Sequence, residues 1–223
     1  AHSGIKTRAV AVGTGQALRN AQNGDADVLL VHAKSAEEAF VKDGWGVQRF
    51  DVMYNDFVIV GPAQDPAKIL DMQVVTEALS QIAHSKALFI SRGDDSGTHK
   101  AEKRLWSETL VDTTAVSGTW YRETGSGMGA TLNMAASMDA YTLTDRASWL
   151  SFSNKRNLAV LVQGDKRLLN QYGVIAVNSQ RHPHVDADNA NAFIDWLTGS
   201  HGQSAISNFR VNGTQLFFPN ALR

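Results

Sequence analysis

The chain has 223 residues, of which 43% are hydrophobic and 19% are charged, and its formal net charge is −1 at pH 7. This composition is typical of a folded globular protein and argues against disorder. Because the net charge is close to zero, no overall field favours nucleic acid or a membrane surface, and any anion site must be built locally. The absence of cysteine excludes thiol catalysis, disulfides and cysteine-ligated metals. No apolar run approaches the roughly 18 residues needed to span a bilayer.

The first sixty residues alternate between strand-like and helix-like segments. The second helical segment opens with Ser35 and Glu38, whose spacing is that of a capping box. The order strand, helix, strand, helix, strand predicts a mostly parallel sheet. The expected strands are residues 5–12, 25–33 and 51–62, and the expected helices are residues 16–24 and 35–44.

The rest of the chain continues the alternation, and no stretch has the composition of an inter-domain tether. Two helices are expected to close it. The expected helices are residues 76–85, 98–108, 125–140 (after a glycine-rich start), 145–154, 187–199 and 202–209, and the expected strands are residues 86–90, 157–163 and 171–179.

This order of segments permits two architectures of the α/β class. In one, the chain leaves a first lobe near residues 57–62, builds a second lobe, and returns near residues 171–177, so that two crossovers form a hinge. In the other, all the strands form one doubly wound sheet. Periodicity alone does not separate the two. The two-lobe layout gives lobe 1 as residues 1–60 plus 172–223 and lobe 2 as residues 61–171.

Four loops rich in Gly, Ser and Thr precede expected helices, and the first two directly follow expected strands. The first backbone N–H groups of a helix lack partners within it, and the helix dipole adds positive potential there, so such loops favour anions. A single loop of this kind is ordinary helix capping. Four of them suggest a shared anion site. The loops are residues 12–16, 91–98, 124–129 and 141–146.

Arg92 strengthens this interpretation because a guanidinium is always charged and can donate two bonds to a tetrahedral oxyanion. The alternative is a surface salt bridge from Arg92 to Asp94 or Asp95. A carboxylate repels an oxyanion that carries no proton. We therefore expect the two aspartates to cap the following helix or to orient Arg92, and not to touch the ligand.

Other chemistries find little support in the sequence. The GDDSG stretch departs from the Gly-Asp-Ser-Gly spacing of trypsin-like proteases, and there is no nucleotide P-loop. His182 and His184 are near Asp186, but no second cluster supplies further metal ligands, which favours a surface loop. The tryptophans do not alternate with basic residues, so nucleic-acid binding is not expected. We expect no catalytic residue, no cofactor and no metal site.

Seven stretches, from about residue 5 to the C-terminus, resemble the substrate-binding proteins of tungstate ABC transporters. That resemblance implies a type II periplasmic-binding-protein fold, with two α/β lobes joined by two crossover strands and an oxyanion enclosed in the cleft. It implies a monomer that delivers tungstate or molybdate to an ABC permease, located in the periplasm or lipid-anchored outside single-membrane bacteria. The stretches are VGTGQAL, NGDADVLLVHA, MYNDFVIVGP, FISRGDDSGTHKAE, GMGATLNMA, YTLTDRASWL and FFPNAL.

The resemblance also implies which residues contact the ligand, through hydroxyls, backbone amides and one guanidinium. Tyr141 would lie nearby, and Arg146 one helical turn further inside. Members of that family begin with a strand that ends in a Thr-Thr-Thr-Ser loop and leads into a helix. These 223 residues do not contain that segment, so lobe 1 is expected to lack its first strand and helix. The implied contacts are Thr14, Ser91, Arg92, Ser96, Thr98, Ser126, Gly127, Met128 and Thr142.

Two alternative functions stay open at this point. An oxyanion sensor or regulatory module would use the same loops and signal to a partner. A phosphate-using transferase or hydrolase would need a base near a nucleophile, for which His99, beside Thr98, is the candidate.

Overall fold

The structure, a computed structural model, describes residues 4–211 and 213–221. Its backbone contacts divide the chain into two compact units. The two main boundaries of the expected lobes lie one and six residues later in the chain than those of the units, and residues 210–216, expected in lobe 1, fall in unit 2. Unit 1 consists of Ala1–Tyr54, Gln171–Phe209 and Phe217–Arg223, and unit 2 consists of Asn55–Asn170 and Arg210–Leu216.

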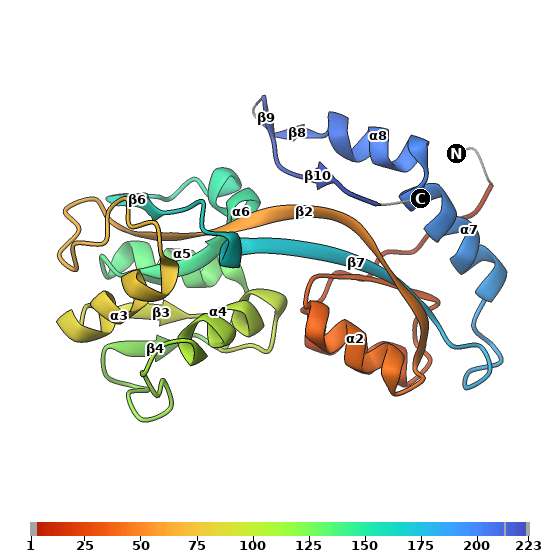
Figure 1. The fold of residues 1–223 in the computed structure, drawn as a ribbon, viewed down its shortest axis with the longest axis horizontal. Coiled ribbons are helices and arrows are strands. Elements are labelled where there is room, and N and C mark those ends of the chain that lie inside the picture. The colour runs from red at the N-terminus through yellow and green to blue at the C-terminus, as the bar shows by residue number, and fades with distance from the viewer. Residues whose placement is uncertain (1–3, 212, 222–223) are drawn as a thin grey trace. The chain divides into compact units, whose positions relative to one another are not determined.

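Two long strands, β2 (Gly46–Pro62) and β7 (Leu169–Val177), carry the chain between the units (Figure 1). The division falls inside both strands, after Tyr54 and after Asn170. This is the two-lobe architecture, with two crossover strands, that the sequence permits. The fold class is therefore confirmed.

In unit 2, a sheet lies between two pairs of helices. The first half of the unit supplies α3 (Val75–Ser85), β3 (Phe89–Ser91) and α4 (Gly97–Ser107). The second half supplies the other pair of helices, α5 and α6, whose bounds are given below. Strands alternate their side chains, so Phe57 and Ile59 of β2 pack with α3 and α4, whereas Val58 and Val60 pack with the other two helices. The remaining elements are β4 (Tyr121–Glu123), α5 (Met128–Ser137), β5 (Thr142–Asp145), α6 (Arg146–Ser151), β6 (Leu158–Val162), the 3₁₀ turn Lys166–Leu168, β8 (Arg210–Val211) and β9 (Thr214–Gln215).

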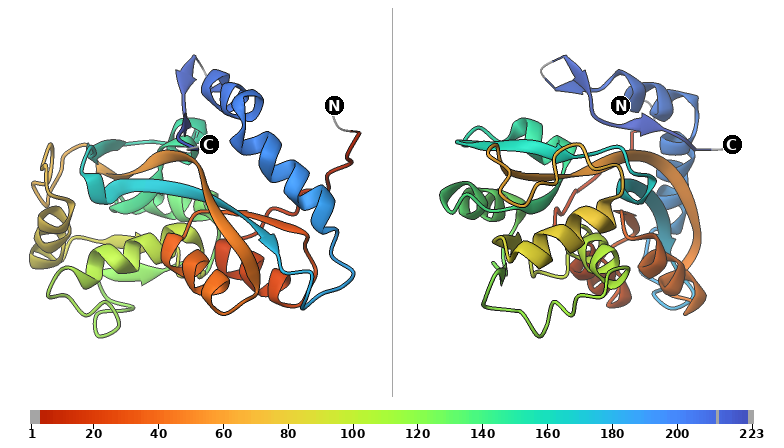
Figure 2. Two further views of the ribbon diagram at one scale, coloured as in Figure 1. Left: turned by 45° about the vertical axis from the view of Figure 1, so that its right-hand side comes forward. Right: turned by 60° about the vertical axis from the view of Figure 1, so that its left-hand side comes forward.

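In unit 1, β1 (Val28–Val31) pairs with β7 and β2 pairs with β10 (Phe218–Pro219). Leu29 and Val31 are buried, while Leu30 between them is 44% exposed, as expected for a strand with one covered face. The consecutive helices α7 and α8 of this unit are visible in both views of Figure 2. The helices of unit 1 are α1 (Thr14–Gln22), α2 (Lys34–Lys42), α7 (Ala187–Thr198) and α8 (Ser200–Asn208).

Several local expectations are wrong. Residues 5–12 form neither helix nor strand, and Val10 and Val12 are 66% and 44% exposed. An alternating pattern becomes a strand only where a neighbour accepts its backbone hydrogen bonds, and no strand in the described ranges forms a ladder with these residues. Residues 142–145, expected as a loop, form strand β5 along β2, with Thr142 opposite Val60.

The sheet is not mostly parallel. Only β3 and β4 form a parallel pair among the strand registers of the described residues, whereas β1 with β7 and β2 with β5, β6 and β10 are antiparallel. The order of elements along the chain does not determine which strands become neighbours. Here β7, which leads back from unit 2, pairs antiparallel with β1, and β5 and β6 pair antiparallel with β2.

The predicted capping box at the start of α2 does not form. The helix begins one residue before Ser35, and the N-cap position is Ala33, which has no side-chain oxygen to offer. The Ala33 N–H instead donates to Glu37 Oε1 at 2.5 Å. Glu37, and not Glu38, therefore supplies the carboxylate that accepts the N–H of the N-cap residue.

Candidate functional site

The loop after β3 is compact and ends at a capped helix. Ser96 is the N-cap of α4, and its Oγ accepts a hydrogen bond from the His99 N–H at 3.2 Å. Gly93 has a φ of +62°, and an added Cβ would lie 2.8 Å from Glu123 Cβ, so only glycine fits. The chain therefore turns tightly between Ser91, the last residue of β3, and Gly97, the first of α4.

Within this loop, Arg92 is held by Asp94. The Arg92 NH2 group donates to Asp94 Oδ2 at 2.5 Å, and Asp94 Oδ1 accepts the Ser96 N–H at 3.2 Å. Burial opposes ionisation of Asp94, but the bonds from Ser96 and Arg92 outweigh it and lower the pKa of its carboxyl. The expected role of Asp94 in orienting Arg92 is confirmed. The ion pair is not a surface one, since the two side chains are only 16% and 17% exposed.

Three buried polar atoms of this segment make no hydrogen bond of ordinary geometry within the described residues: Arg92 Nε, His99 Nε2 and Ser91 Oγ, the last of which lies against Glu102 and Tyr121. The His99 Nδ1 atom accepts the Asp95 N–H at 3.1 Å, so the neutral ring carries its proton on Nε2. Burial lowers the pKa of His99, which favours the neutral ring. Unpaired buried donors are rare in native proteins, so a cluster of them indicates the place of an absent acceptor.

A second loop, before α5, is hydrogen-bonded to the Arg92 loop. The Thr124 N–H donates to the Ser91 carbonyl at 3.0 Å, and Thr124 Oγ1 and the Ser126 N–H donate to the Arg92 carbonyl at 3.1 and 3.2 Å. Gly127 is the N-cap of α5 and offers no side-chain cap. Two helix N-termini and one guanidinium thus lie together. The structure places Ser91, Arg92, Ser96, Thr98, Ser126, Gly127 and Met128 in these two loops and the first turns that follow them.

The remaining candidates in unit 2 begin at β5. The Ile90 N–H donates to the Tyr141 carbonyl at 2.8 Å, which holds the start of β5, and so Thr142, beside β3. Tyr141 itself is occupied, because its hydroxyl donates to Asp65 Oδ1 at 2.8 Å and accepts the Ala67 N–H at 2.9 Å.

Arg146 lies at the start of α6 and is likewise occupied. Its Nε donates to Asp56 Oδ1 at 2.8 Å, and its NH2 group donates to Asp56 Oδ2 at 2.5 Å and to Gln163 at 2.9 Å. This bidentate pair neutralises the guanidinium, so Arg146 offers little charge to a ligand.

In unit 1, Thr14 is the first residue of α1 and is only 2% exposed. Its N-cap, Gly13, makes no side-chain cap, so this helix start resembles that of α5. Thr14 lies in a different unit from the other candidates.

An ionic cluster in unit 1 was not predicted from the sequence. Arg49 donates to Glu37 Oε2 and to Asp51 Oδ1, both at 2.6 Å, and its NH2 atom is buried with no partner in the described structure. An added Cβ on Gly173 would lie 2.3 Å from Glu37 Oε2, so the cluster packs directly on β7. Burial raises the pKa of Glu37, while the bond from Arg49 opposes this. Arg49 and Asp51 are only two residues apart, but Glu37 and above all Gly173 are more distant in the chain, so sequence spacing does not reveal the cluster.

A buried acid–phenol pair in unit 2 was also missed. The Tyr121 hydroxyl donates to Glu102 Oε1 at 2.7 Å, and Glu102 is only 2% exposed. Burial raises the pKa of Glu102 to about 7. A helical pattern could have indicated this, because Glu102 shares a face of α4 with the apolar residues Leu105 and Trp106.

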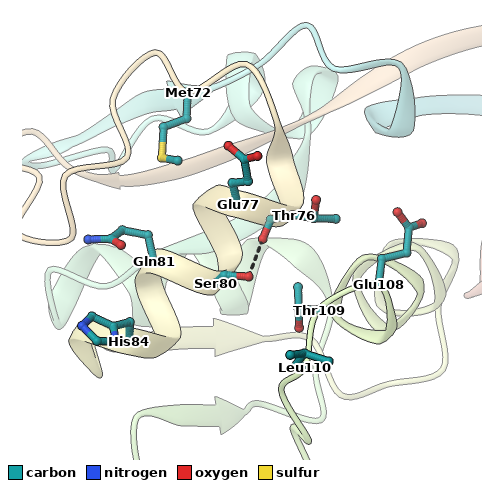
Figure 3. Close-up of a pocket in the computed structure, with 9 residues that line it drawn as sticks. All are labelled: Met72, Thr76, Glu77, Ser80, Gln81, His84, Glu108, Thr109 and Leu110. Atoms are coloured by element: carbon teal, nitrogen blue, oxygen red, sulfur yellow. Dashed lines mark hydrogen bonds between the residues drawn. The ribbon is translucent and has the colours of Figure 1, made fainter.

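A groove of about 610 Å³ beside α3 contains none of the candidate residues (Figure 3). Two carboxylates, Glu77 and Glu108, line it, and Glu108 pairs with Arg104 and Arg167 at 3.3 and 3.1 Å. Such a groove does not suit an anion. Its lining residues are Met72, Thr76, Glu77, Ser80, Gln81, His84, Glu108, Thr109 and Leu110.

The pair His182 and His184 does not make a metal centre. His184 Nε2 lies 2.8 Å from the Gly24 carbonyl, and His182 stacks on Trp45. No group of three or more His, Asp or Glu side chains suited to a metal ion occurs in the part of the chain that the structure describes.

Comparisons with known proteins agree on the family. Residues 1–201 match the model of the PBP superfamily domain. A putative ABC transporter anion-binding protein of Haloferax volcanii is 49% identical over 222 residues, which are 97% of this chain, and the chain spans 64% of that relative's length. The tungstate-binding protein TupA of Peptoclostridium acidaminophilum is 47% identical over 225 residues, covering 99% of this chain and 78% of that protein.

A solved structure gives the same result. The tungstate-binding protein TupA of Desulfovibrio alaskensis G20 superimposes with a TM-score of 0.84 at 46% identity, covering 99% of this chain and 89% of that one. Sequence and fold thus agree over nearly all of the chain. The chain belongs to the PBP superfamily and, within it, to the family of the TupA proteins.

Proposed function

We propose that this chain is the anion-binding component of an ABC transporter, which captures tungstate or molybdate and delivers it to the membrane permease. The observation that carries the proposal is the set of unpaired buried donors around Arg92. The relatives add the ligand class, since they are named as tungstate-binding and ABC transporter anion-binding proteins. The function is binding and transport, without catalysis.

The loop chemistry favours a dianion that carries no proton. Both carboxylate oxygens of Asp94 are occupied, by Arg92 and by the Ser96 N–H, and Asp95 Oδ1 is paired with Lys100. A protonated oxyanion such as hydrogen phosphate needs an acceptor for its proton, and these carboxylates are already engaged. Donors without matching acceptors therefore select tungstate and molybdate over phosphate.

The proposed contacts come mainly from unit 2. Arg92, although paired with Asp94, keeps one donor of its guanidinium, Nε, without a partner in the described structure, and the hydroxyls and first-turn amides of the two loops supply neutral donors. Ser96 Oγ accepts the His99 N–H, and its hydroxyl also bonds Asp94, so a bound ion would compete with Asp94 for the Ser96 proton. A ligand contact from Thr14 is a separate prediction, because Thr14 belongs to unit 1. The proposed contacts in unit 2 are Ser91, Arg92, Ser96, Thr98, Ser126, Gly127, Met128 and Thr142.

The location and the partner follow from the proposed role. A transporter component that collects its ligand before uptake works outside the cytoplasmic membrane, either in the periplasm or lipid-anchored at the surface. Among the described residues, no helix is both long enough and apolar enough to cross a membrane. We propose that the protein is a monomer, that the permease is its partner, and that it does not bind nucleic acid.

The hydrogen bonding of His99 argues against the alternative that the chain is an enzyme. A general base needs an unprotonated nitrogen, but Nδ1 already accepts the Asp95 N–H and Nε2 therefore bears the proton. His99 is thus suited to donate to an anion. A sensor with the same loops would bind the same ligands, and a pull-down of the permease against other partners would separate it from a transport protein.

Titration calorimetry with tungstate, molybdate, sulfate and phosphate tests the function. We expect tight binding of tungstate and molybdate, with sulfate and phosphate at least tenfold weaker. Equal affinity for all four ions would contradict the selection of unprotonated, larger dianions. No detectable binding of any of them would overturn the proposed function.

A further inference from the structure

Glu102 lies close to the proposed anion site without being part of it. It follows Thr98 by four residues on α4, so the two side chains lie on the same helix face with their Cβ atoms roughly 5–6 Å apart. Thr98 belongs to the first turn of that helix, directly after the loop that carries Arg92. A charge on Glu102 would therefore act on an ion bound there through protein and not through water.

No cation balances the carboxyl of Glu102. Its oxygen Oε1 accepts a bond from the Tyr121 hydroxyl at 2.7 Å, the neutral side chains of Ser91 and Trp106 also lie against the carboxyl, and none of the ion pairs among the described residues includes Glu102. The neighbouring Lys103 donates instead to Thr113 at 2.7 Å. A buried carboxylate without a cation is unfavourable, and burial accordingly raises the pKa of Glu102 to about 7.

Tyr121 keeps this pair rigid. Its ring is 1% exposed, stacks on Phe89 of β3 with centroids 5.9 Å apart, and meets Trp106 of α4 edge-on at 6.1 Å. The carboxyl therefore cannot turn away to solvent when a second negative charge arrives. The remaining response is to become neutral.

Resting on the proposed function, we propose that Glu102 takes up one proton from solvent when a tetrahedral dianion binds beside Arg92. The carboxylate and the proton combine to give a neutral carboxylic acid, and nothing else is exchanged. The bound ion then faces one negative charge fewer. By linkage, affinity falls as pH rises above neutrality, by up to about tenfold per pH unit.

Other titratable groups surround this site and must be separated from Glu102. Asp94 and Asp95 are paired with Arg92 and Lys100, and Glu123 on β4 accepts a bond from Ser117 at 3.1 Å. Lys103 on α4 donates to Thr113. His99, also on α4, is the competitor, because a bound anion would favour its protonated form too. Its pKa is lowered by burial, so it would respond on the acid side of neutrality.

The test is calorimetry of molybdate binding at pH 7.0 in several buffers that differ in ionisation enthalpy. For the unaltered chain we expect a buffer-dependent enthalpy that reports uptake of up to about half a proton, since half of the Glu102 side chains would already be protonated. In Glu102→Gln the uptake should vanish, and affinity should stay constant from pH 7.0 to 8.5. The second variant is His99→Gln, which keeps an N–H donor; because His99 belongs to the proposed site its affinity should fall, but each molybdate ion that it binds should be accompanied by the same proton uptake.

The outcomes separate the two proposals. Binding with the same enthalpy in every buffer would overturn the proton uptake but leave the proposed function intact. Uptake that persists in Glu102→Gln, or that is lost in His99→Gln, would also overturn the assignment to Glu102. No binding of any oxyanion would overturn both. If Glu102→Gln does not fold, the unaltered chain and His99→Gln decide, because uptake retained in His99→Gln supports Glu102.

Discussion

Each unit of this protein buries an arginine beside a carboxylate, yet the two arginines are suited to different tasks. Arg49 of unit 1 has two carboxylate partners, Glu37 and Asp51, each at 2.6 Å. Arg92 of unit 2 has one, Asp94. Arg49 therefore lies in a cluster with two carboxylates for one guanidinium. Arg92 has one carboxylate and lies in a segment where buried hydrogen-bond donors have no partner in the described structure. The comparison teaches that the local balance of charge and donors, rather than the presence of an arginine, decides which arginine suits the proposed anion site.

The largest expected effect breaks the unit 1 cluster. Arg49→Ala leaves Glu37 buried without its cation, which should lower the free energy of unfolding by about 3–5 kcal/mol in urea titrations. The double change Glu37→Leu with Arg49→Met removes both charges and should recover most of that loss. If the single and double variants are equally unstable, the cost is one of packing and not of an unpaired charge.

The next effect concerns the buried acid of unit 2. The folded-state pKa of Glu102 is about 7, above its ordinary value of 4.5, so its contribution to stability is present below about pH 4.5 and is lost as pH rises to about 7. The full loss would be about 3 kcal/mol. The free energy of unfolding of Glu102→Gln, measured in urea, should therefore increase relative to that of the unaltered chain between pH 5 and pH 8. A constant difference across that range would contradict the raised pKa.

A third prediction concerns binding. Arg92→Ala should weaken molybdate and tungstate binding at least tenfold, because a charge-assisted hydrogen bond contributes about 1.5–3 kcal/mol. The control is Arg104→Ala, which removes the same charge from the last turn of α4 and should leave affinity unchanged. Calorimetry in which the two variants bind alike would remove Arg92 from the site.

The smallest effect compares two helix starts. Ser96→Ala removes the side-chain cap of α4 and should cost about 1 kcal/mol of stability. Gly13→Ser adds a cap to α1, where the backbone φ of −62° and ψ of 151° suit one, and should gain a few tenths of a kcal/mol. Thermal unfolding measures both. A loss of affinity in Ser96→Ala beyond its loss of stability would indicate a direct contact with the ligand.

Most of the fold and part of the site could be predicted from the sequence, where contacts are local. Helices α3 and α4 follow from apolar spacing within a few turns. The link between Arg92 and Asp94 spans two residues, and the Ser96 cap spans three. Interactions over such short separations are encoded by neighbouring residues and need no knowledge of the rest of the chain.

Only the tertiary structure decided what lies beside what. Arg146 is paired with Asp56, 90 residues away, and the Thr124 hydroxyl meets the Arg92 carbonyl across 32 residues. Residues 5–12 were expected as a strand and residues 142–145 as part of a loop, yet only the latter form a strand, because they pair with β2. Backbone hydrogen bonds and buried charges are satisfied by whichever partner the packing brings near. The sequence by itself therefore determined most helices and the loops that precede α1, α4 and α5. The packing decided which strands form and which side chains become neighbours.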